Sequence, residues 1–453
     1  MTSALALSVS GVTLGGATWA PTGARAQGEP LRVHNLALAV QPKQHIVCQS
    51  VQDVQRAVHD LTTQGRAFSV YSSGHCFAGF SLHNEAVIDV SGMAQIALDG
   101  DLVTAGPGTQ IGALMRVLGA EGRTLPAGFC QTVALGGHLG CGGIGHLSRA
   151  QGLLADHLVA AQVVTATGEV LRVSEAEHPD LFWALRGGGP GSFGIVTEMQ
   201  FRTIPDFQAT HLSALVRLPL AQAARVAAAW QTWSMQLPDS VSTTFDANSP
   251  DFQNIQMNVT VIAHEDSPEL RAAIVQFMGA VPWIEAPRVT QGAYSDLADV
   301  FWPRDYYPTV SMAYASAFSR NTTALDVWQD VFEQMTKQQA PRLQLFIERL
   351  GGAMSSVAPE ATGFVHRDAD FIWQFEGTLN RLHSQAAQEL AVDRFAQGVR
   401  AADGQGAYAG YPNPRDTDWE TAYWGMNYPR LQRVKRRYDP ANVFSHSQSI
   451  RPA

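Results

Sequence analysis

Residues 70–81 read VYSSGHCFAGFS, and this stretch decides the class of fold that the sequence indicates. Its small residues allow backbone N–H groups to come close to an anionic ligand, and a single histidine, His75, stands among them. A second stretch, residues 126–157, reads PAGFCQTVALGGHLGCGGIGHLSRAQGLLADH and places Cys130, His138 and Cys141 among glycines. Glycine concentrated in this way indicates backbone that lies against a ligand.

Composition sets limits on size and partners. The chain has 453 residues, which is too long for one ordinary core and predicts two or more domains. A hydrophobic content of 45% and a charged content of 16% are typical of a packed globular protein. The net charge of −9 argues against nucleic acid or an anionic membrane as the main partner. The four cysteines have no CxxC spacing and do not suggest a disulfide framework.

Residues 1–27 have some features of a leader. Residues 4–20 are mostly apolar or small, and Ala24-Arg25-Ala26 supplies a small-x-small cleavage site before Gln27. No Lys or Arg precedes the apolar run, so a flexible tail is the alternative to an export signal. An export signal would predict a periplasmic or secreted protein, and a flexible tail would predict a cytoplasmic protein. No other segment is long and apolar enough to span a membrane.

Residues 28–205 alternate short strands and helices with many glycine loops. Ser50 and Asp53 have the spacing of a capping box, which predicts a helix that begins after Ser50 and ends at Gly65. Thr167-Gly168 predicts a hairpin between two strands. These patterns indicate an α+β fold for this first domain.

The character of the chain changes after Pro205. Residues 206–404 alternate longer helical patterns with strands such as DFIWQFEGTLN, residues 370–380, and predict an antiparallel sheet covered by helices. Residues 405–453 form a last segment whose helix ends at Asp439-Pro440. We expect its basic residues to form a solvated helix face rather than an anion site; they are Arg430, Arg433, Lys435, Arg436 and Arg437.

Common cofactor motifs are absent or reversed. No Walker P-loop and no HExxH motif occurs, and GGGPGSFG, residues 187–194, follows a helix and precedes a strand, the reverse of a dinucleotide-binding turn. Taken alone, His75 would be an ordinary loop histidine and Cys130 a small buried residue. His138, Cys141 and His146 have spacings that would also suit zinc, which leaves a non-redox zinc or carbohydrate-binding protein as an alternative.

Four stretches carry a more specific signal because they occur in a fixed order. They are SSGHCFAGFS, GFCQTVALGGHLGCGGIG, DLFWALRGGGPGSFGIVTEMQF and NYPRLQRVKRRYDPANVF. In this order the chain resembles the vanillyl-alcohol-oxidase-type (PCMH) flavoproteins, and within them the berberine-bridge-enzyme-like FAD-linked oxidases. The resemblance covers residues 35–205 and 405–450 well. It implies a two-subdomain PCMH-type FAD-binding domain at 28–205, a substrate-binding domain at 206–404, and a C-terminal segment, 405–453, that returns to the FAD domain.

The resemblance also implies how FAD is bound. His75 matches the histidine that bonds to the 8α-methyl group of the flavin, and Cys130 matches the cysteine that bonds to flavin C6, so we expect bicovalent FAD. His138 matches a histidine that hydrogen-bonds the ribityl and pyrimidine side. The other expected cofactor-binding residues are Ser72, Ser73, Gly74, Cys76, Val133, Gly137, Gly142, Gly143, Gly194, Ile195 and Val196. Tyr71 and Cys141 depart from the family's usual Arg and Gly, but neither change removes an attachment atom.

Val133 occupies the family position that controls access of oxygen to the flavin. A small side chain there is typical of oxidases and a larger one of dehydrogenases. The resemblance therefore implies an FAD-dependent oxidase that uses O2 and forms hydrogen peroxide. A flavin dehydrogenase or an oxidative cyclase on the same scaffold is the alternative.

The catalytic base has more than one candidate. Gln374 matches an active-site Gln/Glu position, and strand alternation places Glu376 on the same face, where partial desolvation would raise its pKa. Tyr408 and Tyr411 match tyrosines that lie over the flavin, and we favour them over Glu376 without separating the two. Aromatic residues Trp302, Tyr306 and Tyr307 would line a substrate pocket or pack inside the substrate domain. The expected substrate is a small organic molecule or a sugar with an oxidisable alcohol or amine carbon.

Overall fold

The computed structural model describes residues 18–19, 31–264, 268–281, 283, 287–301, 309–337, 341–379, 384–404 and 406–453. Apart from residues 18–19, the expected leader lies outside these ranges, as do Trp302, Tyr306 and Tyr307. In the part of the chain that is described, no helix combines the length and the hydropathy that a membrane crossing requires.

A small parallel sheet begins the first half of the molecule. Its strands are β2 (Gln44–Val47), β4 (Ala86–Asp89) and β3 (Ser69–Tyr71), in that order. Helix α1 (Val51–Thr63) precedes β3 and begins as expected, because the Ser50 side chain accepts a hydrogen bond from the Asp53 N–H. Strand β3 leads directly into the loop that carries His75, so the sheet fixes where this loop starts.

A six-stranded antiparallel sheet forms the second layer of this half. Its order is β1 (Thr18–Trp19), β5 (Ile96–Asp99), β6 (Leu102–Ala105), β10 (Ile195–Arg202), β8 (Leu158–Val164) and β9 (Val170–Ser174). The helices of this half are α2 (Ile111–Ala120), α3 (Leu135–Gly140), α4 (Ser148–Gln151) and α5 (Pro179–Leu185), and β7 (Arg123–Thr124) pairs with β11 (Ile204–Pro205). Two sheets with helices packed on them confirm the expected α+β class for this half.

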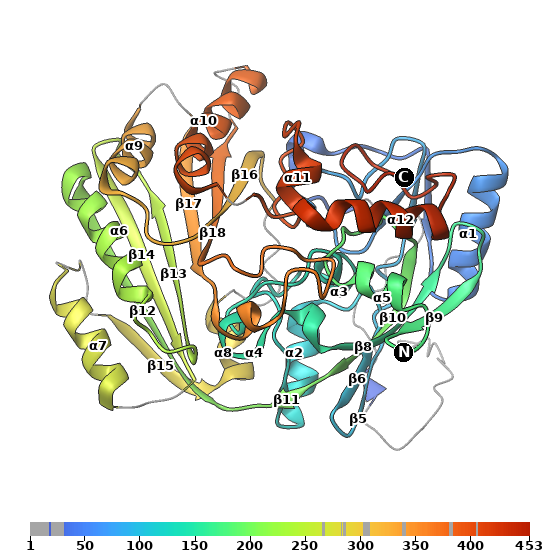
Figure 1. The fold of residues 1–453 in the computed structure, drawn as a ribbon, viewed down its shortest axis with the longest axis horizontal. Coiled ribbons are helices and arrows are strands. Elements are labelled where there is room, and N and C mark those ends of the chain that lie inside the picture. Colours follow the sequence, from blue (N-terminus) through green and yellow to red (C-terminus); the bar gives the residue numbers. More distant parts are fainter. Residues whose placement is uncertain are drawn as a thin grey trace, which may run out of the picture.

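A seven-stranded antiparallel sheet forms the second half (Figure 1). Its order is β15 (Arg288–Ala293), β12 (Gln208–Pro219), β14 (Asn254–Ala263), β13 (Val241–Asn248), β17 (Arg342–Arg349), β18 (Phe371–Thr378) and β16 (Met312–Ser319). Its helices are α6 (Leu220–Ser234), α7 (Pro268–Gly279), α8 (Tyr294–Phe301), α9 (Leu325–Thr336) and α10 (Gln385–Asp403). Trp230, Trp328 and Phe395 from α6, α9 and α10 pack against one face of the sheet, which confirms the expected covering by helices.

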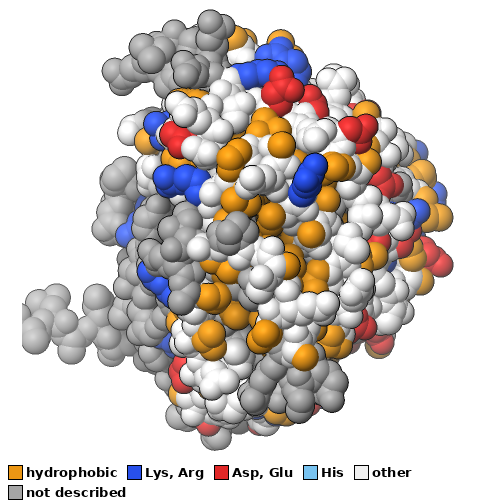
Figure 2. All heavy atoms as spheres, turned by 90° about the vertical axis from the view of Figure 1, so that its left-hand side faces the viewer, with side chains coloured by type: hydrophobic (Ala, Val, Ile, Leu, Met, Phe, Trp, Pro, Cys, Tyr) orange, Lys and Arg blue, Asp and Glu red, His pale blue; other side chains and the backbone are white. Residues whose placement is uncertain are grey.

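The opposite face of this sheet is turned toward the first half (Figure 1). On the outer surface of the second half, hydrophobic side chains are interspersed with acidic and basic ones (Figure 2). Arg367 joins the two halves through a bidentate ion pair with Asp156, in which both N–O distances are 2.7 Å. The Arg367 side chain is 1% exposed. Buried Arg149 adds hydrogen bonds to the backbone oxygens of Val241 (2.9 Å) and Leu350 (2.5 Å).

The C-terminal segment packs on the first half. Helices α11 (Trp419–Trp424) and α12 (Tyr428–Tyr438) contribute Trp424, Leu431 and Val434 to the core of the six-stranded sheet. The expected solvated basic face needs one correction, because the Lys435 side chain is fully buried. Its ammonium group contacts the Asp439 carboxylate, four residues further along the chain, at 2.6 Å, and the Phe444 backbone oxygen at 2.6 Å.

Candidate active site

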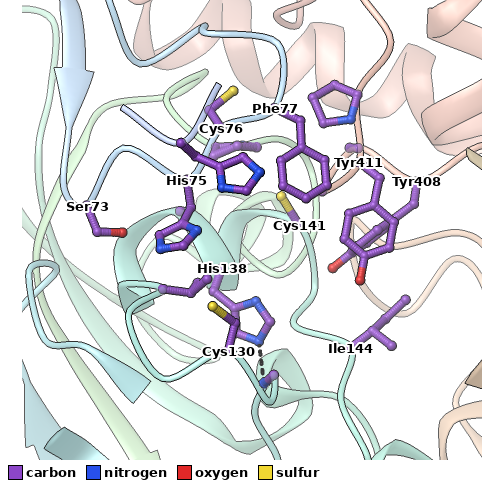
Figure 3. Close-up of a pocket in the computed structure, with 18 of the residues that line it drawn as sticks. Ser73, His75, Cys76, Phe77, Cys130, His138, Cys141, Ile144, Tyr408 and Tyr411 are labelled. Carbon is purple, nitrogen blue, oxygen red and sulfur yellow. Dashed lines mark hydrogen bonds between the residues drawn. The ribbon is translucent and has the colours of Figure 1, made fainter. Parts of the chain in front are cut away.

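One cavity of about 760 Å³ is lined by residues from both halves. The first half contributes the two glycine-rich loops, the second half contributes the uncovered face of its sheet, and residues 408–412 border the cavity from the C-terminal segment. Figure 3 shows His75 and Cys130 on one side of this space and Tyr408 and Tyr411 on the other. The residues expected to hold FAD and those expected to act on a substrate therefore border the same cavity.

His75 lies near the start of the loop that follows β3. Its Nε2 atom is 3.0 Å from the Thr132 Oγ1 atom, and its ring stacks on the His34 ring with the centroids 5.5 Å apart. Burial, with a smaller contribution from His34, lowers the pKa of His75 to about 3. The imidazole is therefore neutral at physiological pH, which is the form in which a ring nitrogen acts as a nucleophile.

Cys130 lies at the start of a tight turn, in which the Val133 N–H donates to the Cys130 carbonyl at 3.2 Å. The Sγ atom is 3.7 Å from the same Thr132 Oγ1 atom that contacts His75. Burial raises the pKa of the thiol, and hydrogen bonds from Thr132 and Val133 oppose this rise. Sequence reasoning missed both His34 and Thr132; the signal was available for Thr132, which lies two residues from Cys130.

Most of the residues expected to bind the cofactor border this cavity. They are His75, Cys130, Ser72, Ser73, Gly74, Cys76, Val133, Gly137, His138, Gly194, Ile195 and Val196. Gly142 and Gly143 do not line it, although they adopt φ of +97° and +81°. A Cβ atom at Gly143 would lie 2.5 Å from the Leu154 Cβ atom, so these glycines shape the backbone turn behind the cavity.

His138 is fixed by the second glycine loop itself. Its Nε2 atom accepts a hydrogen bond from the Gly128 N–H at 2.9 Å, which leaves the proton of the neutral ring on Nδ1. Burial lowers the pKa of His138 to about 4. In the described ranges, no group of three or more His, Cys, Asp or Glu side chains has an arrangement that could hold a metal ion. His146, which the zinc alternative would use, instead has its Nδ1 atom 3.4 Å from the Glu348 Oε1 atom.

The face of β18 that borders the cavity carries Gln374 and Glu376, as the strand alternation predicts. Phe371, Trp373 and Phe375 point to the helix-covered core on the other side. Gln374 and Gln344 both donate hydrogen bonds to the Glu376 carboxylate. Burial nevertheless raises the pKa of Glu376 to about 7, against the opposing effect of these two bonds.

A second carboxyl group on this sheet, that of Asp246, was not predicted from the sequence. Asp246 on β13 borders the cavity, and burial raises its pKa to about 6, while a hydrogen bond from Asn258 opposes the rise. Tyr314 on β16 also borders the cavity, and its hydroxyl group lies 2.7 Å from the Nε2 atom of His34. Polar residues at alternate positions of β13, whose other positions are apolar apart from Thr243, were the available signal for Asp246.

The two expected tyrosines differ in their surroundings. Tyr408 is 4% exposed and packs with Phe318 and Phe364, whereas Tyr411 is only half-buried and stacks on Phe77 with the ring centroids 5.5 Å apart. Burial raises the pKa of both phenols; Glu348 and Glu376 raise that of Tyr411 further.

Gly410 lies directly against Tyr408, which leaves no room for a side chain. A Cβ atom at this position would lie 2.3 Å from the Tyr408 Cε1 atom, so Tyr408 takes the space of a side chain there.

The residues around the cavity fit a covalently held FAD on two observations. A neutral imidazole and a thiol open on the same cavity and share one hydroxyl neighbour, so one ligand could reach both nucleophiles. The Gly137 backbone also borders the cavity, and a Cβ atom there would meet nothing within 4 Å. That open space leaves room for a ligand to approach the backbone.

Two regions of the chain match known domain families. The family described as FAD binding domain matches residues 42–174, and the family described as berberine and berberine like matches residues 407–451. The FAD-linked oxidoreductase YgaK of Bacillus subtilis, itself uncharacterised, is 31% identical over 92% of this chain and 93% of its own length. Aclacinomycin-N/aclacinomycin-A oxidase of Streptomyces galilaeus is 30% identical over 90% of this chain and 84% of its own length.

Solved structures share the fold over nearly the whole chain. A chitooligosaccharide oxidase superposes with a TM-score of 0.84 at 25% identity and covers 95% of this chain and 97% of its own. A glucooligosaccharide oxidase from Acremonium strictum, described as having a 6-S-cysteinyl, 8α-N1-histidyl FAD, superposes with the same TM-score at 22% identity and covers 93% and 94%.

Proposed function

Because this chain belongs to the berberine-bridge-enzyme-like, FAD-linked oxidoreductases, we propose that it oxidises an alcohol or amine carbon of a small organic or sugar substrate and passes the electrons to O2, which becomes hydrogen peroxide. The chain is an FAD-dependent oxidoreductase. In this proposal residues 28–205 bind FAD, residues 206–404 bind the substrate and residues 405–453 complete the site. The observation that carries the proposal is the cavity on which His75, Cys130, Tyr411 and Glu376 all open.

FAD is held through His75 and Cys130 in this proposal, and when bound it supplies an acceptor for the hydride that leaves the substrate carbon. The chain's own residues must then orient the substrate and remove a proton from its hydroxyl or amine group. His138 keeps its Nδ1 proton available to a ligand in the cavity, because its other ring nitrogen is bonded to Gly128.

Tyr411 is the group we assign to contact the reacting hydroxyl or amine. It is the less buried of the two tyrosines and lies near Glu348 and Glu376, which both affect its pKa. Its raised pKa keeps it protonated at neutral pH, so it can accept a substrate proton only as its own proton leaves. Glu376, whose pKa of about 7 matches neutral conditions, takes up that proton in our proposal.

The charges around the cavity limit the class of substrate. Among the described residues that line it, none is Lys or Arg, whereas Asp246 and Glu376 are acids. Amide groups of Asn258, Gln344 and Gln374 add donors and acceptors of the kind that bind hydroxyl groups. A neutral or cationic substrate therefore suits the part of the cavity that the seven-stranded sheet lines, where both acids lie.

The experiment compares Tyr411→Phe, Tyr408→Phe and Glu376→Gln with the wild-type holoenzyme over a panel of neutral sugars and alcohols. Hydrogen peroxide release should depend on substrate, and Tyr411→Phe should lower kcat by roughly 10²-fold or more, as the loss of a proton-transfer group does. The wild-type rate should rise with pH through about 7 and Glu376→Gln should lose this rise.

Tyr408→Phe is the matched control, because it removes a neighbouring hydroxyl but keeps the ring packing. A Tyr411→Phe enzyme that retains the wild-type rate would refute the assignment of Tyr411. Flavin that is reduced by substrate but reoxidises slowly in air would instead support the dehydrogenase or cyclase alternative.

A further inference from the structure

The Thr132 hydroxyl group contacts both proposed attachment residues at once. Its Oγ1 atom is 3.0 Å from the His75 Nε2 atom and 3.7 Å from the Cys130 Sγ atom. Thr132 is 4% exposed, so water does not replace these contacts easily. We propose that Thr132 is a positioning residue for flavin attachment, which holds the proton of His75 on Nε2 and so directs bond formation to Nδ1; this inference rests on the proposed attachment through His75 and Cys130.

One arrangement of protons lets the Thr132 hydroxyl group bond to both residues at once. A threonine hydroxyl has one hydrogen to donate and can accept through its lone pairs. In the proposed arrangement the Thr132 hydroxyl group donates this hydrogen toward the Cys130 sulfur atom. The hydroxyl oxygen is then the acceptor of the bond to His75, so Nε2 carries the proton and Nδ1 carries the lone pair.

The surroundings of His75 keep its ring in this neutral form. The His34 ring stacks on it at an interplanar angle of 26°, and the His34 Nε2 atom is 2.7 Å from the Tyr314 hydroxyl group. A protonated His75 would therefore face another imidazole inside a buried site. The contacts run continuously from Tyr314 on β16 through His34, His75 and Thr132 to Cys130, and they connect the substrate side of the cavity to both attachment atoms.

The chemistry of attachment balances with the oxidant of the proposed reaction. At His75 one C–N bond forms, while one C–H bond of the flavin methyl group and the imidazole N–H bond break. At Cys130 one C–S bond forms, while one C–H bond and the S–H bond break. Each attachment releases two protons and two electrons, which convert one O2 to hydrogen peroxide. In the proposed arrangement, the N–H bond that breaks at His75 is the one directed at Thr132.

The first test determines which ring nitrogen of His75 is linked in the wild-type holoenzyme. Proteolysis of the protein, isolation of the flavin peptide and two-dimensional NMR of its imidazole protons identify the nitrogen. We expect linkage through Nδ1. Linkage through Nε2 would overturn the proposal, because that nitrogen would then be the nucleophile rather than the proton carrier.

The second test measures attachment itself, in a Cys130→Ala background that leaves only the histidyl link. Thr132→Val removes the hydroxyl but keeps the branched shape, and it should lower the fraction of chains with covalent flavin at a fixed time after synthesis by roughly fivefold, the effect of one lost hydrogen bond. Thr132→Ser should restore attachment. Intact mass gives the covalent fraction, and flavin released by acid gives the part bound without a covalent link.

Thr165→Val is the matched control, because Thr165 is also buried in the first half and its hydroxyl group contacts Thr167 at 2.9 Å, in the hairpin of β8 and β9. It should leave attachment unchanged. If Thr132→Val binds flavin and links it at the wild-type rate, the role of Thr132 is refuted while the proposed function stands. If His75→Ala in the Cys130→Ala background still carries covalent flavin, the attachment assignment itself fails.

Discussion

At the scale of single residues, Glu376 shows how the cavity sets the chemistry of a side chain. The carboxyl group is held by two glutamine amides, Gln344 and Gln374, yet its pKa is raised to about 7 because burial outweighs both hydrogen bonds. An unfolded glutamate titrates near pH 4.5. Between these two values the unfolded chain releases a proton that the folded chain retains, so the free energy of unfolding falls as pH rises through this window.

Replacement of Glu376 by Gln removes this titration. We compare the free energy of unfolding of Glu376→Gln with that of the wild type at two pH values. The difference, variant minus wild type, should be roughly 2–3 kcal/mol larger at pH 8 than at pH 5, as expected for a pKa shift of this size. Urea unfolding at the two pH values measures the difference, and the comparison between them cancels any constant change in hydrogen bonding. Glu333→Gln on the exposed side of α9 is the control. An equal stability difference at both pH values would contradict the raised pKa.

Val133 gives a second prediction at this scale. It is partly buried against the core of the first half and borders the cavity next to the turn that holds Cys130. Val133→Leu adds volume there and should slow reoxidation of the reduced enzyme by O2 at least roughly tenfold, while reduction by substrate stays near the wild-type rate. Stopped-flow spectra separate the two half-reactions. Unchanged reoxidation in Val133→Leu would remove Val133 from the control of oxygen access.

The sequence identified the residues that carry ordered motifs, and it failed where a partner comes from a distant segment. His75, Cys130 and Glu376 could be predicted because each stands in a local pattern, a glycine loop or an alternating strand. His34 could not, since its role depends on Tyr314, 280 positions away. The individual roles of these site residues stay predictions.

At the scale of secondary-structure elements, local rules succeeded where one face of an element is buried. Helix α1 begins at its capping serine, and β18 separates a polar face from the Phe371, Trp373 and Phe375 face. Strand β16 was not predicted, because all eight of its residues are buried and its sequence, MAYASAFS, therefore has no alternation.

Helix α12 supplies a stability prediction for an element that looked wholly solvated on its basic side. Lys435 donates to Asp439, and to the backbone oxygens of Ser192 and Phe444, each at 2.6 Å. Lys435→Met leaves the Asp439 carboxylate buried without its counter-charge and should lower the free energy of unfolding by about 3–5 kcal/mol. Chemical denaturation provides the measurement.

Arg436→Met is the control for this substitution, because Arg436 is exposed on the same helix and donates a hydrogen bond to the C-terminal Ala453 carbonyl at 2.9 Å. We expect a change within about 0.5 kcal/mol, as for most surface sites. Comparable losses in the two variants would mean that Lys435 has no special part in holding the helix end.

At the scale of the whole molecule, the cavity exists only while the two halves stay together. Arg367, from the segment between β17 and β18, reaches Asp156 in the first half with both guanidinium nitrogens. Arg367→Met should destabilise the protein by about 3–5 kcal/mol, because Asp156 loses its counter-charge in a largely buried place. Arg320→Met, at an exposed ion pair with Asp368, should cost about 1 kcal/mol or less. Thermal unfolding of both variants tests this, and a similar midpoint for the two would refute the importance of the interdomain pair.

The central claim is that one FAD joins two loops that are 55 positions apart in the chain, and peptide mapping of the holoenzyme tests it most directly. Proteolysis between the loops, followed by mass spectrometry, should yield a single species in which the His75 peptide, the Cys130 peptide and one flavin remain together. His75→Ala should leave flavin on the Cys130 peptide alone, and Cys130→Ala should leave it on the His75 peptide alone. Recovery of both wild-type peptides unmodified and unlinked would contradict the account.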